Sequence, residues 1–305
     1  MYVSQAERGP ESHALPQRPD SRLGILLSAA DGLGRAMVVG DPHLAFTARL
    51  DLIEAAEASI DVQYFIWQND PSGILVIDRL LAAADRGVRV RALVDDVQLE
   101  GLVPKINAIT RHPNIEVRIF NPFSVRFGMQ LRLFRLAEFA IDGNRLNHRM
   151  HNKLLVADNQ AAIMGGRNIG DDYFGLSRKR NFIDTDLLLS GPIVPQLSAG
   201  FDTYWNSGWA VPSDELLQLE MVSVEQEAVR KRIAERLTEY PELTALVVPD
   251  RVEGLAARLL AAHRLQDAQP VVDDPDVAWG ERPDEVADVL TELAQSTQRR
   301  ILIVS

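Results

Sequence analysis

Helices and short apolar strands alternate through the first part of this 305-residue chain. Helical periodicity from Phe46 to Ala58 leads into a run of β-branched and aromatic residues at Ile60–Trp67. The alternation then repeats, with predicted helices at 74–86 and 103–111 and predicted strands at 88–95 and 115–120. Strand–helix–strand units at such short spacing indicate a sheet whose crossover helices cover its faces, which places the chain in the α/β class.

Further elements of the same kind follow along the chain. Strands are predicted at 153–156, 161–164 and 185–189, and helices at 192–205, 214–237 and 285–295. A sheet of this composition needs helices on both faces, so we expect an α/β sandwich with a mixed sheet. The first residues, 1–23, are polar and rich in proline, and we expect them to form a flexible leader.

The composition excludes several kinds of site. There is no cysteine, so disulfides, thiolate zinc sites and cysteine nucleophiles are ruled out. No run approaches the ~20 apolar residues that a membrane-spanning helix needs, and the N-terminus lacks the apolar core of a signal peptide. The net charge of −11 argues against binding nucleic acid over the whole surface.

One cluster of polar residues follows the spacing His151-x-Lys153-x4-Asp158-x6-Gly165-Gly166-x-Asn168. On a strand, side chains two residues apart point the same way, so His151 and Lys153 face one site. Neutral histidine is a nucleophile near pH 7, and lysine stabilises the negative charge that gathers on phosphate oxygens. Glycine at 165 and 166 lets the backbone approach an anion, and Asn168 adds a neutral donor. The pattern predicts attack on a phosphodiester, with phosphate bound by Lys153, Gly165, Gly166 and Asn168.

This spacing resembles the signature of the phospholipase D superfamily. Four further segments are similar to bacterial cardiolipin synthases of the C-type: Tyr64–Trp67, Ala84–Val90, Met150–Lys153 and Gly165–Phe174. The resemblance implies a phospholipase D-like sandwich that transfers a phosphatidyl group through a phosphohistidine on His151, without metal or cofactor. It also implies that an acidic residue on a later strand holds the other ring nitrogen of the histidine. Asp184 matches that position best and Asp186 second, whereas Asp158, part of the signature, is usually structural.

Members of the duplicated type carry two such motifs, and the second histidine protonates the leaving group. None of the other histidines has a lysine two residues later. The chain is therefore expected to be the first half of a two-domain architecture. We expect that it either lacks the second half or pairs with another copy of itself. We expect a catalytic half-domain at 24–210, a helical acidic connecting region at 211–300, and the first strand of a truncated second half at 301–305.

The charge distribution bears on a membrane partner. Residues 211–300 contain 19 acidic and 10 basic residues, a net of −9, whereas residues 126–149 are locally basic. A helix beginning at Met129 is predicted to place Arg132, Phe134 and Arg135 together, which suits either an interfacial helix on anionic lipid or an ordinary surface helix. With the resemblance, this predicts a peripheral protein on the cytoplasmic side of the bacterial membrane that acts on anionic phospholipid.

Three other polar features have plainer interpretations. His148 is expected at the surface or the substrate rim, and Arg178–Arg180 in a solvated loop. Asp95 and Asp96 end a strand without further ligands at metal-binding spacing, so a structural role is expected there. Two alternative functions stay open: a related phosphodiesterase or nuclease, and an inactive half-site that only binds lipid. A nuclease is expected to show a wide basic face, which this acidic chain does not favour.

Overall fold

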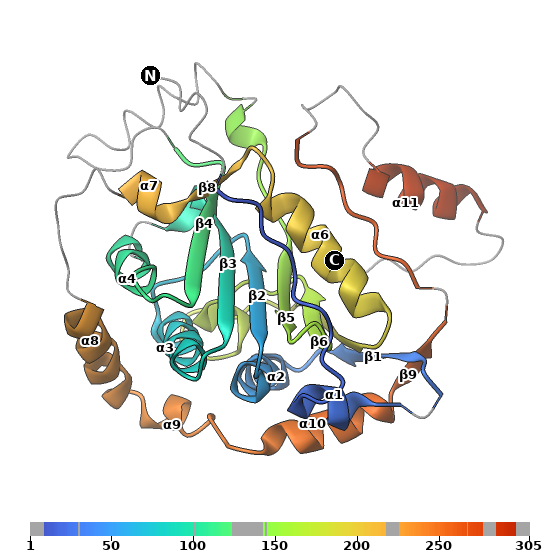
Figure 1. The fold of residues 1–305 in the computed structure, drawn as a ribbon, viewed down its shortest axis with the longest axis horizontal. Coiled ribbons are helices and arrows are strands. Elements are labelled where there is room, and N and C mark those ends of the chain that lie inside the picture. Colours follow the sequence, from blue (N-terminus) through green and yellow to red (C-terminus); the bar gives the residue numbers. More distant parts are fainter. Residues whose placement is uncertain are drawn as a thin grey trace.

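One mixed β-sheet organises the molecule (Figure 1). The computed structural model describes residues 9–29, 31–99, 102–123, 143, 145–217, 226–266, 268–276 and 285–296. Within them the sheet has nine strands in the order β8-β4-β3-β2-β5-β6-β7-β1-β9. The strands are β1 (Gly34–Val39), β2 (Ser59–Tyr64), β3 (Arg89–Asp95), β4 (Ile115–Phe120), β5 (Lys153–Ala157), β6 (Ala161–Gly165), β7 (Asp186–Ser190), β8 (Ala210–Pro212) and β9 (His263–Leu265).

Helices cover both faces of this sheet, as predicted for an α/β sandwich. The helices of the described residues are α1 (Arg22–Leu27), α2 (Pro42–Ala55), α3 (Pro71–Asp85), α4 (Val103–Ile109), α6 (Ile193–Trp205), α7 (Ser213–Leu217), α8 (Gln226–Thr238), α9 (Pro241–Thr244), α10 (Arg251–Leu260) and α11 (Glu285–Ser296), of which α11 stands apart from the sheet. Strands β2, β3 and β4 are parallel and are connected through α3 and α4, whereas β5, β6, β7 and β1 pair antiparallel. Because β2 is covered on both faces, all six of its residues are buried.

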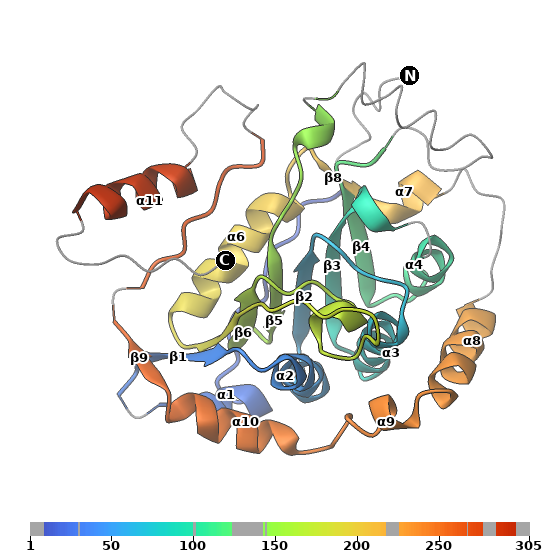
Figure 2. The same cartoon turned by 180° about the vertical axis from the view of Figure 1, so that it is seen from behind.

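The two faces of the sheet carry separate apolar cores. The larger core is shared by α1, α2, α3, α4, α8 and α10. On the other face, α6 packs its Val194, Phe201 and Trp205 onto the sheet, where it crosses in front of the strands in Figure 1. Seen from behind, in Figure 2, the loop between β6 and β7 lies against the face opposite α6. That loop joins the larger core through Ile169 and Phe174.

Most predicted elements are confirmed to within a few residues. Strand β4 has the predicted bounds, and α3 ends before Gly87, whose φ of +96° suits glycine after a helix. Strand β1 was not predicted. Its pairing partner is β7, where Val38 lies opposite Leu187 about 150 residues later in the chain, and local sequence does not report such a distant partner.

The leader expected at residues 1–23 is not flexible from Gly9 onward. Arg118, which is 1% exposed, donates to the carbonyl of Pro10, and Arg91 donates to the carbonyl of Ser12. The backbone N–H of Ser12 donates to Asn206 in return. The segment is held because two buried guanidinium groups need acceptors. Any residue offers a backbone carbonyl, so the sequence carried no signal for this contact.

The expected boundary at residue 210 does not separate two units. Helices α8 and α10 contribute Val229, Ile233 and Leu255 to the larger core, and β9 extends the same sheet beside β1. Helices are found in residues 211–300, as predicted. In place of the single helix expected at 214–237, the described residues form α7 and α8, and residues 218–225 between them are not described. The region therefore completes the core of the half-domain instead of only connecting it to another.

Two predictions fall on residues outside those described. They are the helix from Met129 with its lipid contacts Arg132, Phe134 and Arg135, and the strand at 301–305. Both stay predictions.

Candidate active site

Strand pairing brings the parts of the motif to one end of the sheet. Lys153 opens β5 and lies opposite Tyr64, the last residue of β2. Gly165 closes β6 and lies opposite Asp186, the first residue of β7. Antiparallel pairing of β5, β6 and β7 therefore places His151, Lys153, Gly165, Gly166 and Asp184 around one point, as the sequence predicted.

The histidine and the lysine share one aromatic neighbour. The ring of His151 lies 4.8 Å from the ring of Phe65, centroid to centroid. Lys153 is 5% exposed; its Nζ lies 5.2 Å from the centre of the same Phe65 ring and donates to the His151 carbonyl at 2.6 Å. Within the described part of the chain neither ring nitrogen of His151 has a hydrogen-bond partner, so both are free to meet a substrate. Phe65 was noted in the sequence only as part of a resembling segment, and its contact was missed.

Burial shifts the two ionisable groups toward the states that phosphate chemistry needs. Partial burial, and second the charge of Lys153, lower the pKa of His151 below its usual range, while Asp184 opposes the shift. Burial lowers the pKa of Lys153 to about 8, against the opposing charges of Asp184 and Asp95. At pH 7 the histidine is therefore neutral and nucleophilic, and the lysine is still charged.

These pKa values predict a pH profile for the reaction with a phosphodiester. Phosphate binding requires protonated Lys153, so kcat/KM is expected to fall about tenfold per pH unit above about pH 8. On the acid side it is expected to fall only below the ordinary histidine pKa, since the pKa of His151 is lowered. The measurement is kcat/KM against pH. In Lys153→Arg the fall that Lys153 contributes near pH 8 is expected to disappear, which leaves only the alkaline fall of the acid that protonates the leaving group; an alkaline profile unchanged in that variant contradicts the assignment.

The two glycines of the motif leave room for carboxylates. A Cβ at position 166 would collide with the carboxylate of Asp184, and one at position 165 would collide with Asp186 and the carbonyl of Thr185. Asp184 accepts the backbone N–H of Thr185 at 2.8 Å, and its negative charge opposes the lowering of the pKa values of His151 and Lys153. Among the described residues it makes no hydrogen bond to His151. Its assignment as the acid that orients the histidine stays a prediction.

Gly166→Ala tests the placement of Asp184. The added methyl displaces the carboxylate, and a displacement of about 1 Å near reacting groups costs about 10²-fold in rate. We expect the initial rate of transfer to fall by about that factor while the fold is kept. Gly254→Ala is the matched control, because a Cβ there meets nothing within 4 Å and lies in α10. Equal rates in the two variants would show that Asp184 is not held by Gly166.

The described structure gives two motif residues structural contacts. Asp158 lies at the other end of β5 from Lys153 and accepts the backbone N–H groups of Glu57, Ala58 and Ser59 at 2.8–3.2 Å. It therefore fixes the connection between α2 and β2, in keeping with the structural role that the resemblance implies, and the catalytic role that the motif also suggested for Asp158 stays a prediction.

Asn168, which was predicted to bind phosphate, is 4% exposed and ties the loop after β6 to the end of β2. Its Oδ1 accepts from Ile66 N and its Nδ2 donates to the Tyr173 hydroxyl. Its second amide hydrogen has no partner among the described residues, so its contact with phosphate stays a prediction.

A second group of residues fixes the segment that precedes His151. Asp95, at the end of β3, accepts the N–H of Met150 at 3.1 Å and pairs with Arg149 at 3.1 Å. Burial raises the pKa of Asp95 to about 7, against the charge of Arg149. Asn121 donates to the carbonyls of Arg145 and His148. The structural role expected for Asp95 is thus visible, but its target, the backbone beside His151, was not foreseen.

The remaining candidates lie around this site. His148 is half-buried between Phe120 and Trp209, and its Nε2 lies 2.9 Å from the Pro275 carbonyl, so it is a packing residue as much as a rim residue. Arg178–Arg180 are exposed. In the part of the chain that the structure describes, no helix combines the length and apolarity of a membrane span. The same residues include no group of three or more histidine or acidic side chains suited to a metal ion.

Comparison with known proteins identifies sequence relatives of this arrangement. Residues 50–205 match the family model described as "Cardiolipin synthase, PLD-like domain". Cardiolipin synthase C of Escherichia coli K12 is 38% identical over 86% of this chain and 54% of its own length. The major cardiolipin synthase of Bacillus subtilis 168 is 32% identical over 55% of this chain and 32% of its own length.

Structural comparison gives a looser likeness. The phosphatidylserine synthase of Haemophilus influenzae Rd KW20 matches with a TM-score of 0.45 and 14% identity, over 67% of this chain and 43% of that one. The family match rests on sequence and does not depend on that structure. The chain spans about half the length of the first relative and about a third of the second.

Proposed function

Because the chain belongs to the cardiolipin synthase, PLD-like domain family, we propose that it supplies one catalytic half-site for phosphatidyl transfer between phospholipids. The observation that carries the proposal is the pairing of a neutral His151, with free ring nitrogens, and a buried charged Lys153 at one end of the sheet. That pair supplies a nucleophile and a charge for the oxygens of a phosphodiester.

The proposed reaction has two steps. A ring nitrogen of His151 attacks the phosphorus of phosphatidylglycerol, the bond from phosphorus to the glycerol headgroup breaks, and glycerol leaves after taking a proton from an acid. A glycerol hydroxyl of a second phosphatidylglycerol molecule then attacks the phosphorus and gives its proton to the conjugate base of that acid, the phosphorus–nitrogen bond breaks, and cardiolipin is released. Lys153 stabilises the charge on the phosphate oxygens in both steps, and Asp184 stabilises the imidazolium that forms on His151.

The acid of the first step is proposed to come from outside this half-site. No second histidine of the chain has a lysine two residues later. The proton donor is assigned to a second half-domain of the same kind or to a second copy of the chain. The substrate side is assigned to anionic phospholipid in a bilayer, met from the cytoplasmic face of the bacterial membrane without crossing it.

The second candidate is phosphodiester hydrolysis at the same half-site. In that reaction water replaces the acceptor lipid, and the diester that is cleaved is a lipid or a nucleic acid. The same His151 and Lys153 would support it. The acidic net charge of −11 speaks against nucleic acid as the substrate.

Incubating the purified protein with phosphatidylglycerol and phosphatidylethanolamine separates the candidates. The proposal predicts cardiolipin and free headgroup in proportion, as followed by lipid mass spectrometry. Release of phosphatidic acid alone would indicate hydrolysis. Cleavage of DNA or a soluble diester, with neither lipid consumed, would contradict the lipid assignment.

A further inference from the structure

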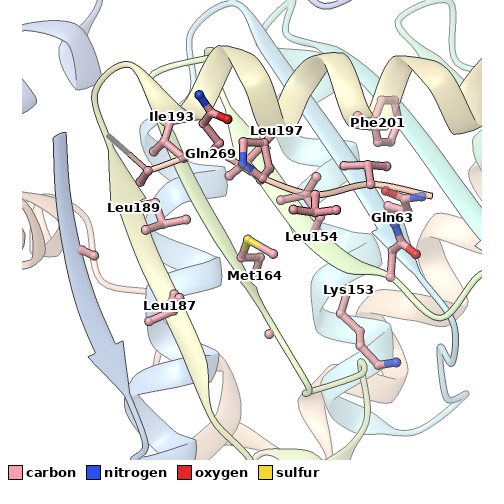
Figure 3. Close-up of a pocket in the computed structure, with 18 of the residues that line it drawn as sticks. Gln63, Lys153, Leu154, Met164, Leu187, Leu189, Ile193, Leu197, Phe201 and Gln269 are labelled. Carbon is pink, nitrogen blue, oxygen red and sulfur yellow. The ribbon is translucent and has the colours of Figure 1, made fainter. Parts of the chain in front are cut away.

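A cavity of about 380 Å³ lies between α6 and the sheet. Figure 3 shows its lining: Leu154 from β5, Met164 from β6 and Leu187 and Leu189 from β7 face Ile193, Leu197 and Phe201 of α6. These side chains are aliphatic or aromatic. The volume falls within the range of roughly 300–1,000 Å³ that small-molecule sites occupy.

The cavity exists because α6 does not seal this part of the sheet. Side chains at alternate positions of β6 and β7 point toward α6, yet Leu187 is 38% exposed and the neighbouring Val38 of β1 is 61% exposed. Such apolar surface beside a catalytic residue is costly to leave in water. Its position calls for an apolar occupant.

A segment of chain covers the cavity without filling it. Residues 268–272 line it from the side opposite the sheet. They continue into Pro275, whose carbonyl meets His148, and Asp276, which accepts the N–H of Gly208 at 2.9 Å. Val272 packs directly on Gly200 of α6, where a Cβ would lie 2.9 Å from Val272 Cγ2. These contacts hold the cover against α6.

The catalytic pair stands at one end of the same cavity. His151, Lys153 and Gly165 are among its lining residues, and Figure 3 shows Lys153 at one end, with its amino group directed outward from the apolar side chains, and Leu189 and Ile193 toward the other end. Among the described residues that line the cavity, Lys153 alone carries a charge at pH 7. The site thus offers a cation where phosphate must sit and an apolar space leading away from it.

We propose that this cavity holds one acyl chain of the phospholipid whose phosphate reacts at His151. A phosphate joined through glycerol to an acyl chain matches both ends. The phosphate carries the negative charge that Lys153 attracts, and the acyl chain is apolar like the rest of the cavity. The inference rests on the proposed function, which it deepens by giving the donor lipid a place for its tail. It also predicts that residues 268–272, which cover the cavity, contact the lipid.

Photo-crosslinking tests where the chain goes. The probe is phosphatidylglycerol with a diazirine at the end of one acyl chain, carried in phosphatidylcholine vesicles, and the adducts are mapped by mass spectrometry. We expect adducts on the far lining, at residues such as Leu189, Ile193 and Gln269. Adducts confined to the exposed Phe182 and Ile183, or to residues outside the cavity, would overturn the proposal.

Equilibrium binding tests the same idea without turnover, so its result is independent of whether transfer occurs. Monomeric phosphatidylglycerols with progressively longer acyl chains are expected to gain about fourfold in affinity for each methylene that enters the cavity. Filling the cavity with Leu197→Trp is expected to remove this gain and weaken the longest members at least about tenfold. Leu265→Trp, at the half-buried residue of the edge strand β9, repeats the test at a position that disturbs the core less.

Ile25→Trp is the matched control, since Ile25 is 63% exposed on α1, which packs with α10 and the larger core. It is expected to keep the full dependence on chain length. Affinity that is independent of chain length in the unaltered protein would overturn the proposal and would indicate that a segment of the protein itself fills the cavity. If affinity still rises with acyl-chain length in both Leu197→Trp and Leu265→Trp, the proposal is overturned as well.

Discussion

Replacing His151 with alanine is expected to lower phosphatidyl transfer by a factor on the order of 10⁴ or more, because the nucleophile of the first step is lost. The fold is expected to survive, since the His151 side chain is exposed and makes no hydrogen bond within the described residues. Cardiolipin formation is measured with protein prepared in the same way as the unaltered protein that makes cardiolipin in the transfer assay. The unfolding free energy of the variant is measured beside it.

His13→Ala is the matched control, because His13 is an exposed histidine whose nearest acid is Asp202 at 3.7 Å, away from the motif. It is expected to keep full transfer. Transfer that persists in His151→Ala at more than about a hundredth of the normal rate would contradict the nucleophile assignment.

Replacing Asp186 with alanine is expected to destabilise the fold by about 3–5 kcal/mol. The Asp186 carboxylate is fully buried and accepts from Arg49 at 2.9 Å and Arg167 at 3.3 Å. Both guanidinium groups are themselves buried, so removing the carboxylate leaves two cations without their counter-charge in the core. Chemical denaturation measures the loss.

Asp184→Asn, two residues earlier, provides the contrast. Asp184 is half-buried and pairs with no arginine among the described residues, so the unfolding free energy is expected to change by less than about 1 kcal/mol. Its effect is expected on the transfer rate, through His151. If Asp184→Asn destabilises the fold as much as Asp186→Ala does, the division of roles between the two aspartates is wrong.

The sequence predicted the part of the fold that local patterns encode. Strands such as β4 and β5 carry β-branched or aliphatic runs bounded by turn residues, and α3 ends where glycine must adopt a positive φ. Strand β1 and the ordered segment from Gly9 escaped prediction for one physical reason. Each is stabilised by partners far along the chain, such as Leu187 opposite Val38 or Arg118 at the Pro10 carbonyl.

The candidate site divides in the same way. Period-two spacing was enough to place His151 and Lys153 together, and the paired glycines were correctly associated with a close approach. The approach is made by the carboxylates of Asp184 and Asp186, in addition to any substrate anion. Phe65 directly follows β2 and Asp95 ends β3, and the sequence spacing alone gave no reason to bring them to the motif.

The central claim is that His151 becomes covalently bonded to phosphorus, and trapping that bond tests it most directly. Protein incubated with phosphatidylglycerol is quenched by denaturant at mildly alkaline pH, which preserves both the phosphorus–nitrogen bond and the acyl esters, and is then digested and mapped by mass spectrometry. The account predicts a phosphatidyl group on the peptide that contains His151, present in His13→Ala and absent in His151→Ala. Cardiolipin formation that proceeds with the adduct on another residue, or with no adduct at all, would contradict it.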